Sequence, residues 1–85
     1  HGDLHVYPVP TQGTLTVAGS SVVAATLWFE VFGTDGRLAY RSTKKASGPF
    51  TTTVDLGDLV EGTYVLRVIT TTGELIGTRR FELAR

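Results

Sequence analysis

Cysteine is absent from the 85 residues, and so are methionine and asparagine. Without cysteine the chain has no disulfide, no thiolate metal site and no cysteine nucleophile. Without asparagine it has no N-glycosylation site and none of the Lys–Asn isopeptide cross-links found in some surface adhesins. Because the initiator methionine is missing as well, we expect a domain cut or released from a longer protein.

Net charge is also lacking, since eight basic residues oppose eight acidic ones and the formal charge is +0. Proteins that bind nucleic acid or anionic membranes carry a basic excess, so we expect no nucleic-acid partner. The longest nearly apolar run, Val22 to Phe29, is far shorter than the roughly 18–20 residues that cross a bilayer. We therefore expect no direct membrane insertion. Because no basic segment followed by an apolar stretch stands at the start, we also expect these residues to hold no signal peptide.

A credible catalytic or metal-binding set is missing too. The two histidines, His1 and His5, would lie about 13 Å apart in an extended strand, too far to share one ion. His5 is the only candidate general base, and no serine stands in a nucleophile-elbow setting. The carboxylates fall in or beside turns, where capping explains them, and no glycine cluster matches a phosphate-binding loop. We therefore predict a non-enzyme that holds no metal and no cofactor.

Valine, leucine, threonine and glycine dominate what is present, with turn signals every 8–12 residues. Threonines alternate with apolar residues, which is typical of strands with one wet face. We predict one all-β domain over residues 1–85, an immunoglobulin-like antiparallel β-sandwich with Greek-key topology, in preference to a barrel. About seven strands are expected, at residues 4–7, 14–18, 24–32, 38–43, 50–54, 63–71 and 74–83.

One local pattern points to the type of sandwich. Leu59, Gly62 and Tyr64 stand at the head of a long strand, as in a tyrosine corner, where the phenol bonds the backbone a few residues upstream. The alternative is an ordinary buried tyrosine. The alternating pattern also predicts the main core residues, which are Leu15, Val17, Phe29, Val31, Leu66, Val68, Phe81 and Leu83.

Trp28, Glu30 and Phe32 share the second face of the strongest strand. If all three were exposed, they would suggest a flat sugar-binding platform; if that face packs on the other sheet, they belong to the core. We interpret them as core or partly covered, because a domain this small can spare few aromatic side chains.

Two dibasic pairs remain, Lys44-Lys45 in a polar loop and Arg79-Arg80 on the last strand. Charged side chains on an edge strand discourage edge-to-edge pairing, and that interpretation is preferred. The functional alternative is a recognition mark read by a partner.

The order of the motifs resembles the C-terminal sorting domains of the type IX secretion system. An opening with Tyr7, Pro8, Pro10 and Gly13 is similar to the Y-P-N-P-x-x-G of that family, and a strand ends in a turn with Asp35 and Gly36. A block of Asp55-Leu56, Leu59, Gly62, Tyr64, Leu66 and Val68 follows, and then a Gly73 turn and a last strand, Arg79 to Leu83. Val9 departs from the family's asparagine, which caps a turn through its side chain, and this puts the local turn geometry in question.

The resemblance implies that the domain is a secretion signal. Such domains direct a parent protein that has reached the periplasm to the outer-membrane translocon, with shuttle proteins as partners. A sortase-like surface transpeptidase then usually cleaves before the domain, and the parent ends at the cell surface or outside the cell. We expect the last hairpin to be the recognition surface, through β-augmentation. The residues expected to act there are Arg79, Arg80, Phe81, Leu83 and Arg85, with Gly62, Tyr64 and Gly73 shaping the hairpin.

A different class of function stays open at this point. An accessory immunoglobulin-like or carbohydrate-binding module of an extracellular enzyme would share the sandwich fold. An exposed Trp28 would favour that alternative.

Overall fold

The computed structural model describes residues 4–85, apart from the side chains of Val22 and Val23. Those residues form an all-β fold in which every strand pairing is antiparallel and no helix occurs. Over the same residues no helix is long and apolar enough to cross a membrane. The strands are β1 (His5–Tyr7), β2 (Thr14–Gly33), β3 (Leu38–Asp55), β4 (Gly62–Thr70) and β5 (Leu75–Leu83).

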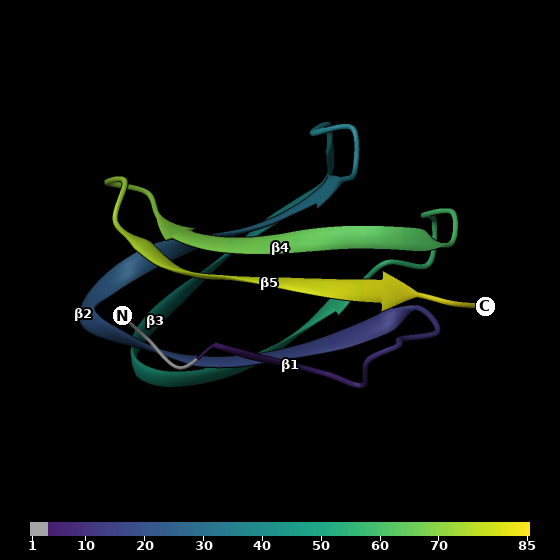
Figure 1. Ribbon diagram of the computed structural model, residues 1–85. Helices are drawn as coiled ribbons and strands as arrows, with labels where there is room; N and C mark the ends of the chain where they lie inside the picture. Colours follow the sequence, from purple (N-terminus) through teal and green to yellow (C-terminus); the bar gives the residue numbers. More distant parts are fainter. Residues whose placement is uncertain (1–3) are drawn as a thin grey trace.

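The long hairpin of β2 and β3 organises the fold into two layers (Figure 1). Residues 14–18 of β2 lie between β1 and the end of β3, which makes a three-stranded layer. Residues 27–33 of β2 lie between β4 and the start of β3, and β5 completes a four-stranded layer. The immunoglobulin-like sandwich is thus built from one sheet folded over on itself.

The fold-over explains why five strands replace the seven expected. Hydrogen-bonded pairing of β2 with β3 continues on both sides of a register shift between Ser21 and Ala25, and a bulge bends paired strands without ending them. Gly48, opposite Ser21, has a φ of 77°, a conformation that residues with a Cβ rarely adopt. The prediction that strands are interrupted after residue 18 and between residues 43 and 50 was therefore wrong, because β2 and β3 run through both places.

The core lies between the two layers. All eight core residues predicted from the alternation are buried, the most exposed of them being Leu83 at 2%. Phe29 packs edge-to-face on Phe50, with ring centroids 5.8 Å apart, a favourable geometry for aromatic pairs. The core also takes in Leu4, Leu27, Val54, Leu56, Tyr64 and Ile76.

A crossing segment and a bulge set the position of the last hairpin, β4 and β5. The segment from Asp55 to Glu61 crosses from the three-stranded to the four-stranded layer with Leu56 buried. A bulge beside Gly77 shifts the β4–β5 register between Leu75 and Gly77 and turns Ile76 into the core.

Candidate functional site

The last hairpin, β4 and β5, is braced at its base by Tyr64. The Tyr64 hydroxyl donates a hydrogen bond to the Val60 carbonyl, four residues upstream. The ring is 7% exposed and stacks on Phe81, with centroids 5.9 Å apart. The predicted tyrosine corner is therefore confirmed, and it ties the crossing segment to the start of β4.

Replacing Tyr64 with phenylalanine keeps the packing and removes only this hydrogen bond. We expect Tyr64→Phe to lower the free energy of unfolding by about 0.5–1.5 kcal/mol, the usual net contribution of one such bond. Chemical denaturation of the purified domain measures the loss, with Tyr7→Phe as control because Tyr7 is 50% exposed. Equal stability of the two variants would show that the corner hydrogen bond contributes nothing.

Arg85 closes the same end of the fold. One nitrogen of its guanidinium, Nη2, donates to the carbonyls of Leu56, Gly57 and Leu59 at 2.9, 2.9 and 2.6 Å. Its backbone N–H donates to Glu61 Oε2 at 3.2 Å. Arg85, expected among the recognition residues, is therefore engaged inside the domain, where it holds the crossing segment.

The outer edge of β5 is partly unpaired. The Glu82 carbonyl accepts from the Thr11 N–H at 2.9 Å, and the Ala84 N–H donates to the Thr11 carbonyl at 2.8 Å. Among residues 4–85, backbone pairing of this edge is confined to Thr11. Because backbone groups alternate in direction along a strand, those of Thr78 and Arg80 point the same way as Glu82, toward the open edge.

Thr11 pairs with the edge of β5, and sequence reasoning did not predict this contact. It is completely buried, and its Oγ1 donates to the Thr14 carbonyl at 2.6 Å and accepts from the Gly13 N–H at 3.2 Å. A threonine followed closely by glycine after prolines is a turn signal. Its pairing with β5, however, joins residues some seventy positions apart and leaves no local mark.

The two arginines expected to be recognised are both exposed, on opposite faces of β5. Arg79 is the cross-strand partner of buried Leu66, and Arg80 is the partner of Val65. Arg79 Nη1 donates to the carbonyl of Thr78 at 2.9 Å. The Arg79 guanidinium therefore covers the Thr78 carbonyl, a backbone acceptor that no strand among residues 4–85 pairs. Inward-facing charge of this kind protects edge strands from unspecific pairing.

Phe81 and Leu83, the other predicted recognition residues, are 1% and 2% exposed. A partner would not contact such side chains directly. Their contribution to recognition would be to shape the edge that carries Arg79 and Arg80.

The remaining motif residues form turns. Asp35 Oδ1 accepts from the Arg37 N–H at 3.0 Å, and Gly36, with a φ of 82°, allows the tight β2–β3 turn. Gly73 serves the β4–β5 turn, where its N–H donates to the Thr70 carbonyl.

The opening motif lies on the surface beside β1. Tyr7, Pro8 and Pro10 are exposed, Gly13 is half-buried, and both prolines follow cis peptide bonds. Together with Thr11 these residues make the loop that runs from β1 to the edge of β5.

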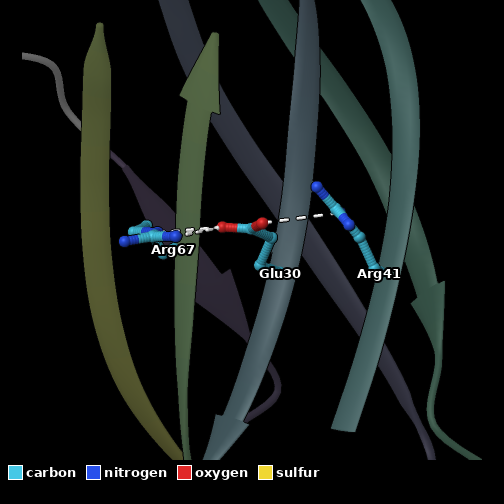
Figure 2. A network of polar contacts seen from close by, with 3 residues as sticks. All are labelled: Glu30, Arg41 and Arg67. Atoms are coloured by element: carbon cyan, nitrogen blue, oxygen red, sulfur yellow. Dashed lines mark hydrogen bonds and ion pairs between the residues drawn. The ribbon is translucent and has the colours of Figure 1, made fainter. Parts of the chain in front are cut away.

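A charged network lies across the outer face of the four-stranded layer (Figure 2). Glu30 on β2 is 6% exposed, and its Oε1 accepts from Arg67 Nε at 2.9 Å and Nη2 at 2.6 Å. Its Oε2 lies 3.5 Å from Arg41 Nε on β3. The two arginines also stack on aromatic rings, Arg41 on Trp28 at 3.9 Å and Arg67 on Phe32 at 5.1 Å.

This network corrects the interpretation of Trp28 and its neighbours in one respect. The face does not pack on the other layer; instead, arginine side chains partly cover it. Sequence reasoning found the three face residues on β2 but missed Arg41 and Arg67, because their pairing with Glu30 depends on cross-strand register.

The part of the chain that the structure describes offers few side chains that could bind a metal ion. No group of three or more histidine, cysteine, aspartate or glutamate side chains there could hold an ion. His5 is exposed on β1, and His1, the other histidine, lies outside the described residues.

Comparison with known families gives one finding that covers nearly the whole chain. The model of a family described as "Secretion system C-terminal sorting domain" matches residues 5–79. Comparisons with curated proteins and with solved structures gave no significant match.

Proposed function

The chain belongs to the family of secretion-system C-terminal sorting domains, which are sorting signals of type IX secretion, and from this premise we propose that the outer edge of β5 is what the machinery recognises. The family is one of export signals rather than of enzymes. Membership implies interaction with the type IX machinery and export to the cell surface or the extracellular space.

The observation that carries the proposal is the outer edge of β5 at residues 78–80, where no backbone hydrogen bond from another of residues 4–85 pairs the strand. Unpaired backbone donors and acceptors on an edge strand are a template for an added strand. The backbone of Arg80 and the N–H of Thr78 present such groups, while the Thr78 carbonyl is held by the Arg79 guanidinium, which a partner strand would displace. Arg79 and Arg80 also place two exposed cations beside this edge. In this proposal the backbone supplies the affinity and the arginines select an acidic partner strand.

The fuller route rests on the family resemblance. Residues 1–85 act as one sorting domain on a parent protein that crosses the periplasm. Shuttle proteins and the outer-membrane translocon bind the domain, and a sortase-like surface transpeptidase then removes it. Secretion to the surface follows from recognition of the folded domain, so the signal is a surface and not a linear peptide.

Fusion of the 85 residues to the C-terminus of a reporter that is exported to the periplasm tests the proposal. In a cognate type IX host we expect reporter on the cell surface, measured by antibody labelling of whole cells against periplasmic fractions. Arg79→Glu with Arg80→Glu is expected to reduce display by roughly tenfold, because like charges across an interface are strongly unfavourable.

The control for charge is Arg37→Glu with Lys44→Glu, two exposed cations away from the β5 edge. Thermal unfolding of both purified double variants checks that each still folds. Loss of display in both would mean that net charge, not the β5 edge, matters. A reporter retained in the periplasm by the unmodified domain would end the proposed function itself.

A further inference from the structure

The outer face of the four-stranded layer carries exposed apolar side chains in two rows across the strands. In one row Phe32 of β2 is paired with Leu38 of β3 and Val65 of β4, and the last two are 47% and 37% exposed. In the other, Ile69 of β4 lies between Trp28 and Leu75, and Leu75 is 49% exposed. Exposed apolar side chains gathered on one face mark an interaction site rather than ordinary surface.

Between the two rows runs the charged network of Arg41, Glu30 and Arg67 (Figure 2). Glu30 is enclosed, while the Arg41 and Arg67 side chains are 46% and 41% exposed. A guanidinium has five N–H donors, and Arg67 directs only those of Nε and Nη2 toward Glu30. Placed over aromatic rings, the two guanidinium groups keep further donors for an outside acceptor, and carboxylates are the acceptors that match a guanidinium best.

The charge of the face is positive although the chain is neutral. Strand positions of this face hold Arg41, Arg67, Arg80 and Lys45 against the two carboxylates of Glu30 and Glu82. Glu30 is already neutralised by its two arginines. The surface that complements this face is therefore apolar with carboxylates.

A glycan fits the same face poorly. Arg41 lies over the Trp28 ring at 3.9 Å, which occupies the aromatic surface on which a sugar would stack. A sheet face with apolar rows four residues apart along β2 and β4 suits packing by another sheet or a helix, which is a protein surface.

We propose that this outer face is a second docking surface, adjoining the β5 edge at Arg80, for an apolar and acidic surface of a protein of the secretion machinery. The inference rests on the proposed function, since it takes its partner from the export route. The machinery would then contact two adjacent surfaces of the domain, the edge of β5 and the outer face, which share Arg80.

Substitution of the three most exposed apolar residues of the face tests this. Leu38→Thr, Val65→Thr and Leu75→Thr together are expected to reduce surface display of the fused reporter by about tenfold, because the apolar contacts at the centre of an interface dominate its affinity. The matched control is Val9→Thr with Val60→Thr, which changes two other exposed apolar side chains and is expected to leave display unchanged. Thermal unfolding of the purified domain verifies that both variants fold.

Two neighbouring lysines give a charge test on one strand. Lys45 is paired with Thr26 on the outer face, whereas Lys44 is paired with buried Leu27 on the opposite face, and both lysines are exposed. Lys45→Glu is expected to lower display severalfold and Lys44→Glu to leave it unchanged. Equal effects of the two substitutions would overturn the assignment to the outer face.

A photo-crosslinking side chain at position 65 identifies what covers the face during export. The expected product is a covalent adduct with another protein, lost in the presence of Leu38→Thr and Leu75→Thr. An adduct with lipid or glycolipid, an adduct with a second copy of the domain, or no adduct would overturn the inference.

If the triple threonine variant is displayed normally while the Arg79 and Arg80 reversal is not, the second docking surface is wrong and the proposed function stands. Retention of the unmodified fusion in the periplasm would instead contradict the proposed function itself.

Discussion

Phe29→Ala is expected to destabilise the domain by about 3–5 kcal/mol, the usual cost of emptying a buried phenylalanine site. Phe29 is 1% exposed, lies on the central strand β2 and meets Phe50 edge-to-face. Residues of β3 and β4 flank it on both sides, so neighbouring backbone has little freedom to collapse into the cavity. A domain has only some 5–15 kcal/mol of stability in total, so urea denaturation should show a large part of it lost.

A leucine pair provides the control for burial. Leu66 is fully buried and Leu38 is 47% exposed, so the same truncation to alanine removes core contacts in one case and surface contacts in the other. We expect Leu66→Ala to cost about 2–5 kcal/mol and Leu38→Ala to stay within about 0.5–1 kcal/mol. Similar losses at the two positions would contradict the assigned core.

Much of the fold could be predicted because it is encoded locally. Alternation placed Leu15, Val17, Leu66 and Val68 in the core, and the spacing of Leu59, Gly62 and Tyr64 predicted the tyrosine corner. The continuity of β2 and β3 could not be predicted, since glycine and serine mark a turn and a bulge alike. Only the pairing on both sides of Ser21 decides between the two.

The candidate site, too, has features that could be predicted from the sequence and features that could not. Arg79 and Arg80 could be proposed from a dibasic pair on the last strand, and the structure places both at the surface. The engagement of Arg85 with the Leu56–Leu59 carbonyls and the pairing of Thr11 with β5 join distant segments. Such contacts depend on how the layers close, and no spacing along the chain reports them.

Deletion of residues 79–85 is expected to have the largest effect, because it removes structure along with the recognition edge. The deletion takes away Phe81 and Leu83, which are buried, and the Arg85 guanidinium that holds the crossing segment. Each buried side chain alone is worth about 2–5 kcal/mol, and together they approach the stability of the whole domain. We expect the truncated domain to show no cooperative thermal transition and its fusion to remain in the periplasm.

Deletion of Ala84 and Arg85 alone separates these causes. It keeps every residue of β5, so the open edge at Thr78 and Arg80 stays, and it removes only the last two residues and their bonds. We expect a stability loss of a few kcal/mol, in line with hydrogen bonds from a charged donor, with display surviving at a temperature where the domain is folded. Display abolished in a folded Ala84–Arg85 deletion would place recognition at the chain end itself. Undiminished display from the longer deletion would show that the machinery reads neither the β5 edge nor the folded hairpin.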